Sequence, residues 1–335
     1  MTGLLDWIII GGGPAGLACA IEATKKGYTH LVIEKGCVVN SIFHFPTDMT
    51  FFTTADLLEI GEVPMIISAE KPKRQDALRY YRRVVDHCDL SVREQERVVS
   101  VRGKEGDFRI ESIDRLGTKR EYRSGRVIVA TGYYDNPNML NIPGEELSKV
   151  SHYYTECHPY FHKKVAVIGG KNSAAETALD LHRNAGAEVT LIHRGESMSR
   201  DVKYWVLPDI NNRLERGEIK AWFSSRIEEI RNEEIVISTP EGHVTLENDY
   251  VLALTGYHPD VDFLRAMGVE VEPETCIPTH TSETLETNVK GIFLAGSIAS
   301  GKMTNRIFIE TGRFHGIRIF NHFPSADVQE PVPAS

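Results

Sequence analysis

The chain begins with a short apolar run that ends in glycines. Residues 6–10 are almost continuously apolar, which is typical of a buried parallel strand, and apolar positions at helical spacing follow through Leu17 and Ile21. A second apolar run over residues 29–33 ends at Glu34. This pattern predicts a strand, a turn, a helix and a second strand, which together make a βαβ unit.

The same pattern returns in the second half of the chain. Residues 164–168 predict a strand, residues 169–174 a turn followed by a helix, and residues 188–192 the next strand. A shorter apolar run over residues 250–256 closes this second unit. The chain is therefore predicted to be an α/β protein with two Rossmann-like dinucleotide-binding domains.

The segment between the two units has a different pattern. Residues 92–130 alternate apolar and polar positions, with turn signals at residues 104–107 and 117–118, which predicts an antiparallel meander. At the other end of the chain, residues 323–335 contain three prolines and no apolar period. We expect that tail to be disordered.

Composition narrows the classes of function. The 335 residues are 41% apolar and carry a formal charge of −9, which argues against a nucleic-acid partner. No apolar run approaches the ~18 residues of a membrane span and the N-terminus lacks a signal-peptide pattern, so we expect a cytoplasmic protein without a membrane partner. The five cysteines lack CxxC or zinc-ligand spacing, which predicts neither a disulfide scaffold nor a metal site.

Gly11, Gly13 and Gly16 form a GxGxxG motif that follows a strand and opens a helix. Gly11 permits the tight turn, Gly13 lets the backbone approach a pyrophosphate, and Gly16 allows close packing of the helix. The helix N-terminus then faces the phosphates. Glu34, at the end of the next strand, can accept hydrogen bonds from ribose hydroxyls. We assign this turn to FAD.

The second glycine turn is less regular, because Lys171 stands where the middle glycine of the motif would be. At the end of its second strand the usual acid is replaced by His193 and Arg194, and a cation there suits a ribose that carries a 2′-phosphate. This favours NADPH over NADH. One site for FAD and one for NADPH imply hydride transfer from nicotinamide to flavin.

Several longer strings of residues are unusual enough to identify a family. They include residues 130–134 (ATGYY), 158–161 (HPYF), 256–260 (GYHPD), 291–296 (GIFLAG) and 307–310 (IFIE). With them the chain resembles the thioredoxin reductase group, and within it the bacillithiol disulfide reductase family, over roughly residues 5–322. The resemblance implies an FAD enzyme that uses NADPH to reduce the disulfide of a low-molecular-weight thiol in the cytosol, as a homo-oligomer such as a dimer or tetramer.

The resemblance also implies domain limits and further contact residues. Residues 1–148 and 260–322 would form a discontinuous FAD-binding domain, and residues 149–259 an inserted NADPH-binding domain. Further FAD contacts are expected from Pro14, Ala15, Lys35, Phe51, Phe52, Thr131, Gly132, Gly296, Ser297 and Ile307, with the two phenylalanines covering the flavin ring. NADPH contacts are expected from Gly169, Gly170, Lys171, Asn172, Ser173, His193, Arg194 and Gly256.

The chain departs from these families at three positions. Thioredoxin reductases carry a CxxC pair before the second dinucleotide strand, where this chain has Cys157 alone, so no catalytic cysteine pair exists there. Many bacillithiol-disulfide-reductase-like sequences carry a cysteine in the first turn, where this chain has Ala15. The aspartate of the C-terminal motif is replaced by Ser297. We therefore expect the flavin itself to deliver the electrons, with Cys157 as the single candidate thiol.

Other functions remain open from the sequence. A ferredoxin or flavodoxin–NADP reductase of the same architecture needs no protein thiol, and the basic cluster formed by Lys71, Lys73, Arg74, Arg79, Arg82 and Arg83 suits an acidic electron carrier as well as a carboxylate-bearing thiol. A flavin monooxygenase would need Phe and Gly where Glu146 and Ser148 stand. A flavin-binding redox sensor without turnover is the remaining alternative.

Overall fold

The computed structural model describes residues 3–326, which form two compact units. Unit 1 runs up to His44, continues over Met49–Asn136 and resumes at Tyr257, whereas unit 2 comprises Phe45–Asp48 and Pro137–Gly256. Residues just after Pro137 belong to unit 2 because they pack there: the Ile230 N–H donates to the Pro143 carbonyl at 2.9 Å. The first unit is thus discontinuous and the second is inserted into it.

Unit 1 is built on a seven-stranded sheet with the order β3-β2-β1-β6-β5-β4, in which β15 also pairs with β6. The strands β3, β2, β1, β6 and β15 are parallel, and the predicted meander forms the antiparallel part, β4 to β6. The strands are β1 (Leu4–Ile10), β2 (His30–Ile33), β3 (Val92–Arg93), β4 (Glu96–Lys104), β5 (Asp107–Asp114), β6 (Lys119–Val129) and β15 (Ile292–Leu294).

Both faces of β1 are covered, which explains its continuous apolar sequence. Ile8 and Ile10 belong to a core cluster with Leu264 of α7 (Val261–Ala266). Trp7 packs instead against Phe293 and Phe320, with ring centroids 5.5 and 4.8 Å away. All four residues Trp7 to Ile10 are buried, so the strand is fixed from both sides.

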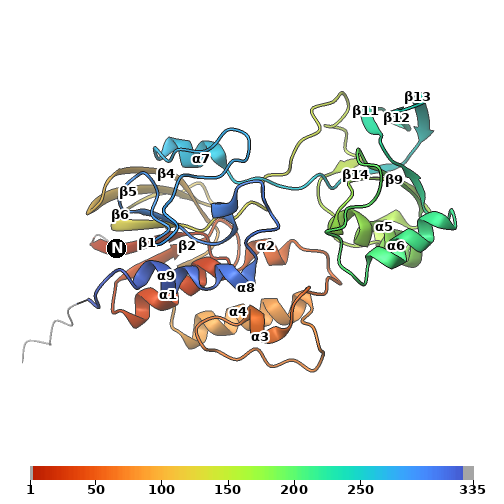
Figure 1. The fold of residues 1–335 in the computed structure, drawn as a ribbon. Coiled ribbons are helices and arrows are strands. Elements are labelled where there is room, and N and C mark those ends of the chain that lie inside the picture. Colours follow the sequence, from red (N-terminus) through yellow and green to blue (C-terminus); the bar gives the residue numbers. More distant parts are fainter. Residues whose placement is uncertain (1–2, 327–335) are drawn as a thin grey trace, which may run out of the picture. The chain divides into compact units, whose positions relative to one another are not determined.

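Helix α1 packs on β1 and β2 of this sheet, and α1 and α9 lie side by side (Figure 1). Gly316 permits this packing, because a Cβ there would lie 2.8 Å from the Ala18 carbonyl oxygen. The helices are α1 (Pro14–Lys25), α2 (Asn40–Phe43), α3 (Ala55–Leu58), α4 (Arg74–His87), α7 (Val261–Ala266), α8 (Ile309–Gly312) and α9 (His315–Phe320), with the 3₁₀ helix η2 (Gly296–Ser300).

Unit 2 has a parallel five-stranded sheet with the order β10-β9-β8-β14-β7. Its strands are β7 (Val150–Ser151), β8 (Lys164–Ile168), β9 (Glu188–Ile192), β10 (Lys220–Trp222) and β14 (Tyr250–Ala253). One face packs on α5 (Asn172–Asn184) and α6 (Leu207–Glu215), and the other on an antiparallel sheet of β11 (Arg226–Ile230), β12 (Glu234–Thr239) and β13 (Gly242–Glu247). A short 3₁₀ helix, η1 (His158–Tyr160), precedes β8. The predicted class, an α/β protein with two Rossmann-like domains, is confirmed.

The ordered part of the chain extends further than the sequence predicts. Disorder was expected from Phe323 onward, yet the Phe323 ring packs 5.1 Å from the Trp7 ring and the Ala326 N–H donates to the Lys26 carbonyl at 2.8 Å. Aromatic packing on the buried Trp7 holds this segment despite its prolines. The rest of the expected tail, residues 327–335, lies outside the described residues.

Candidate functional site

The first glycine turn joins β1 to α1, and its three glycines have different surroundings. A Cβ on Gly11, whose φ is +110°, would lie 2.5 Å from the Ala130 carbonyl oxygen, and a Cβ on Gly16 would overlap the carbonyl oxygen of Gly11. A Cβ on Gly13 would meet no atom within 4 Å. Gly11 and Gly16 are therefore required by the fold, whereas Gly13 borders open space in front of the helix N-terminus.

Glu34 follows β2 and is buried beside this turn. Its Oε2 accepts the Gly12 N–H at 2.7 Å, and its Oε1 accepts the Gly36 N–H at 2.8 Å. Burial raises the pKa of the Glu34 carboxyl, and the two hydrogen bonds act in the opposite direction. The side chain thus shapes the turn itself, in addition to the ribose contact predicted for it.

A second group of predicted FAD residues lies at the end of β6. The Thr131 hydroxyl is buried and has no hydrogen-bond partner among the described residues. Gly132 has a φ of +68°, and a Cβ there would lie 3.5 Å from Oγ of Ser297 in η2. The structure therefore places Thr131, Gly132 and Ser297 together, with a hydroxyl left for an external partner.

Ala15 connects the glycine turn to η2 and α8. A Cβ on Gly296 would lie 2.8 Å from the Ala15 Cβ, and one on Gly312 would lie 3.9 Å from it. Ile307, another predicted FAD contact, is also near Gly312, 3.5 Å from the same hypothetical Cβ. Pro14 begins α1, where a missing N–H is harmless. Position 15 is therefore closely surrounded by small residues.

The remaining predicted FAD residues have unlike environments. Phe51 is buried, with 7% of its surface exposed, whereas 55% of Phe52 is exposed, so the two rings are not equivalent. The Lys71 ammonium lies 5.6 Å from the Phe52 ring centroid. Lys35 forms an ion pair with Asp135 at 2.8 Å.

The residues present in unit 1 fit a flavin dinucleotide. Open space at Gly13 is where a pyrophosphate would meet the N-terminus of α1, and the unpaired Thr131 hydroxyl is a donor or acceptor for a bound group. Buried polar atoms are normally hydrogen-bonded, so the orphaned hydroxyl points to a ligand at this place.

The second glycine turn, in unit 2, joins β8 to α5. Gly169 has a φ of +148°, and a Cβ there would lie 2.6 Å from the Leu254 carbonyl oxygen. Lys171 precedes α5 with its side chain 66% exposed, and its Nζ lies 3.9 Å from Asp201. Asn172 is engaged by the chain that follows β9, since its Oδ1 accepts the Lys203 N–H at 2.8 Å. Ser173 is exposed at the start of the helix.

His193 and Arg194 follow β9 at the edge of this turn. The His193 ring fills the space beside Gly170, where any Cβ would overlap it. Partial burial, and then the Arg194 charge, lower the pKa of the His193 ring. Arg194 is exposed, so the positive charge predicted at this strand end comes from Arg194. Gly256, with a φ of +89°, pairs with Asn138 instead, whose N–H donates to its carbonyl at 2.9 Å.

All five cysteines are free thiols. Burial raises the pKa of the Cys157 thiol, and the nearby Asp180 raises it further. Burial also raises the pKa of the thiols of Cys19, Cys37 and Cys88. A reactive cysteine needs the opposite, a lowered pKa next to positive charge.

The basic cluster is divided by the fold. Arg74 is buried, and its guanidinium donates to the carbonyls of Ile42 and Phe43. It holds α4 to α2 and cannot receive a partner. Arg79, Arg82 and Arg83 are exposed on α4.

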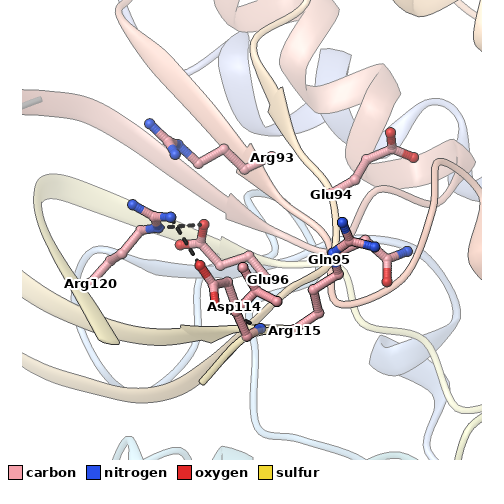
Figure 2. Close-up of a pocket in the computed structure, with 8 residues that line it drawn as sticks. Arg93, Glu94, Gln95, Glu96, Asp114, Arg115 and Arg120 are labelled. Carbon is pink, nitrogen blue, oxygen red and sulfur yellow. Dashed lines mark hydrogen bonds and ion pairs between the residues drawn. The ribbon is translucent and has the colours of Figure 1, made fainter. Parts of the chain in front are cut away.

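Charged residues line a cavity beside β3 and β4, and several of them bind other residues of the protein (Figure 2). The buried Glu96 accepts hydrogen bonds from Ser112 at 2.5 Å and from Tyr122 at 2.6 Å, and Arg120 pairs with Asp114 at 2.9 Å. Burial, followed by Glu96, raises the pKa of Tyr122 to about 12, so its hydroxyl stays a donor. This network ties the meander strands together, and none of the predicted site residues lies in it.

Fold and site together are typical of one class of protein, the oxidoreductases that use a flavin and a pyridine nucleotide. The comparisons with known proteins agree. The family model described as pyridine nucleotide-disulphide oxidoreductase matches residues 8–296, and the chain belongs to this family.

Three relatives are more specific. The chain is 48% identical to bacilliredoxin reductase Bdr of Bacillus subtilis, over 92% of this chain and 94% of that protein. Its fold matches the bacillithiol disulfide reductase Bdr (YpdA) of Bacillus cereus with a TM-score of 0.93 and 46% identity, over 95% and 98% of the two chains. The Staphylococcus aureus enzyme of that name gives 0.91 and 42%, over 96% and 98%. The family resemblance inferred from the sequence is confirmed, and the chain is a flavin-dependent enzyme of the disulfide reductase type.

The alternatives are less similar. A ferredoxin–NADP reductase of Ignicoccus hospitalis is 26% identical over 95% of this chain, so that function is not favoured. A flavin monooxygenase of Stenotrophomonas maltophilia shares the fold at 22% identity. Within residues 3–326, every helix is too short or too polar to cross a lipid bilayer.

Proposed function

We propose that the chain is an NADPH-dependent FAD enzyme that reduces a small disulfide, bacillithiol disulfide. Gly13, the N-terminus of α1 and Glu34 would hold the pyrophosphate and ribose of FAD, and Thr131 and Ser297 would bind further along it. Gly169 to Ser173 and Arg194 would hold NADPH. The observation that carries the FAD site is the open space at Gly13 beside the unpaired Thr131 hydroxyl. The substrate is proposed from the names of the two structural relatives.

When bound, FAD accepts a hydride from the nicotinamide and supplies two electrons to the disulfide. The overall reaction consumes NADPH, one proton and the disulfide, and yields NADP⁺ and two thiols. This chain's own residues bind and orient these groups. Ala15 offers no thiol in the first turn, and burial disfavours the Cys157 thiolate, so no protein disulfide is proposed as an intermediate.

The test is stopped-flow reoxidation. The purified protein is reduced with NADPH under anaerobic conditions and mixed with bacillithiol disulfide, with an oxidised bacilliredoxin, or with ferredoxin. Fast reoxidation by bacillithiol disulfide supports the proposal. Fast reoxidation by ferredoxin alone would replace it with the electron-carrier alternative. A preference for bacilliredoxin would make a protein disulfide the substrate, as the name of the Bacillus subtilis relative suggests.

We further propose a cytoplasmic homo-oligomer, a dimer or a tetramer, from the same resemblance. An enzyme that reduces the disulfides of low-molecular-weight thiols is needed where thiols are kept reduced, which is the cytosol. Light scattering of the FAD-bound protein measures the oligomeric state, and a monomer at micromolar concentration would contradict this expectation.

A further inference from the structure

His315 is the first residue of α9 and is buried, with 7% of its surface exposed. Its Nδ1 accepts the Gly296 N–H at 3.0 Å. Gly296 is the first residue of η2 and closely follows the end of β15. The hydrogen bond therefore joins η2 to α9.

Gly296 lies in a position where its backbone has little freedom. Its φ is +76°, in the left-handed region, and a Cβ there would lie 2.8 Å from the Ala15 Cβ. On the preceding residue, the Ala295 N–H donates to the Val129 carbonyl of β6 at 2.9 Å. The Gly296 N–H does not continue the pairing with β6 and donates instead to the His315 ring. A buried N–H without an acceptor would be costly.

The next residue is Ser297, a proposed FAD contact. A Cβ on Gly132 would lie 3.5 Å from the Ser297 Oγ, so the serine hydroxyl faces the Thr131–Gly132 segment. The place of Ser297 thus depends on two anchors of the segment before it. One is the β6 backbone, and the other is the His315 ring.

We infer that His315 is a positioning residue, which fixes the Gly296 amide so that Ser297 faces the flavin site. This inference rests on the proposed FAD site. The ring can act in this way only while Nδ1 carries no proton, because a protonated nitrogen donates and cannot accept. Burial, followed by the charges of Arg318 and His280, lowers the pKa of His315 to about 4. The ring is therefore neutral at neutral pH, and the hydrogen bond from the Gly296 N–H requires the tautomer whose proton is on Nε2.

Two substitutions separate the acceptor from the ring. In His315→Asn the side-chain carbonyl oxygen can stand where Nδ1 stands, whereas His315→Leu keeps similar bulk but offers no acceptor. The dissociation constant for FAD is measured by titrating each apoprotein and following the quenching of flavin fluorescence. We expect His315→Leu to raise this constant by about tenfold or more, as loss of a buried hydrogen bond implies, and His315→Asn to stay close to wild type.

A control variant removes the effect of stability alone. Val84→Ala opens a cavity in α4, where Val84 is fully buried, and lowers stability without touching η2. At equal loss of melting temperature, Val84→Ala should retain FAD affinity while His315→Leu does not. Wild-type affinity in His315→Leu, or equal weakness in His315→Asn and His315→Leu, would overturn the inference. A wild-type protein that takes up no FAD would overturn the proposed function, and this inference with it.

Discussion

The Glu34 carboxylate accepts the Gly12 N–H of the first glycine turn at 2.7 Å. The residue expected to bind the ribose therefore also holds the turn in place. The second oxygen accepts the Gly36 N–H, so both oxygens are already engaged by the protein. A carboxylate oxygen has two lone pairs, which leaves one on each for a ligand hydroxyl. The acid after β2 therefore shapes the glycine turn and keeps acceptor capacity for the proposed ribose contact.

Replacing Glu34 with glutamine should destabilise the protein even without cofactor. The amide NH₂ group would face one of the two backbone N–H donors, leaving a buried donor unpaired at about 1–3 kcal/mol. We expect a lower melting temperature of the Glu34→Gln apoprotein in a thermal unfolding scan. Glu62→Gln is the control, because that side chain is largely exposed on the same unit. An unchanged melting temperature in Glu34→Gln would show that the two hydrogen bonds contribute little.

Gly13 and Gly16 should differ in what their substitution damages. In Gly13→Val the new side chain enters open space, and the backbone there is extended, so this variant should fold normally as apoprotein. It should nevertheless weaken FAD binding by roughly hundredfold or more, because the side chain occupies the pyrophosphate position. Gly16→Val should instead lose stability, since its Cβ overlaps the Gly11 carbonyl oxygen. Flavin absorbance and melting temperature of each variant distinguish the two effects, and a fully yellow Gly13→Val protein would contradict the first.

Arg194 should determine the preference for NADPH. If its guanidinium binds the 2′-phosphate, Arg194→Ala raises the KM for NADPH by about tenfold and leaves the KM for NADH nearly unchanged. Steady-state oxidation of each coenzyme measures this. Arg216→Ala is a matched control, because it removes an exposed arginine at the end of α6 in the same unit. Equal effects on both coenzymes would assign Arg194 another role.

The five cysteines should be dispensable for electron transfer. The pKa directions at Cys19, Cys37, Cys88 and Cys157 all disfavour a thiolate. A protein in which alanine or serine replaces all five cysteines should therefore keep most of the rate at which the NADPH-reduced enzyme is reoxidised by disulfide. If the rate is lost and returns when Cys157 alone is restored, direct transfer from the flavin is wrong.

His315 should make stability depend on pH below neutrality. Its pKa in the folded protein is about 4, lower than the ordinary value of 6.5. Between these two pH values the unfolded chain therefore binds a proton at this residue and the folded chain does not. This contribution is complete above pH 6.5 and is lost as the pH falls toward 4, by up to about 3 kcal/mol. His315→Asn should lack it, so the unfolding free energy of the wild-type protein should fall relative to that of His315→Asn as the pH falls. A constant difference between pH 7 and pH 4.5 would contradict the lowered pKa.

Local patterns explain why the fold could be predicted. Each βαβ unit is specified by residues that lie close together in the sequence, such as Gly11, Gly13 and Gly16, and by apolar runs whose period depends only on backbone geometry. The strands β8 and β9 begin and end where the pattern predicts. The antiparallel sheet of β11 to β13 was not anticipated; a bulge between Ile227 and Glu229 interrupts the alternation in β11, although β12 and β13 pair in continuous register.

Contacts between distant segments could not be read from the sequence. The bond from Gly296 to His315 spans separate elements, and nothing in the residues around either one indicates it. Arg74 belongs to a run of cations in the sequence, but two carbonyls at the end of α2 bury its guanidinium. Phe51 and Phe52 are adjacent and chemically alike, yet one is buried and the other exposed, because the chain bends at Phe52 and the surrounding structure decides which ring is covered.

The entry and exit of the inserted unit are tied together by short hydrogen bonds. In unit 2 the Asn138 N–H donates to the Gly256 carbonyl at 2.9 Å, and in unit 1 the His258 N–H donates to the Asn136 carbonyl at 2.9 Å. Because these bonds join the two ends of the insertion, its length adds little to the entropy cost of closing the loop when unit 1 folds. The insertion is not independent of the rest of the chain, however, because Phe45–Asp48 also belongs to unit 2, and the Thr47 N–H donates to the Thr155 carbonyl at 2.8 Å.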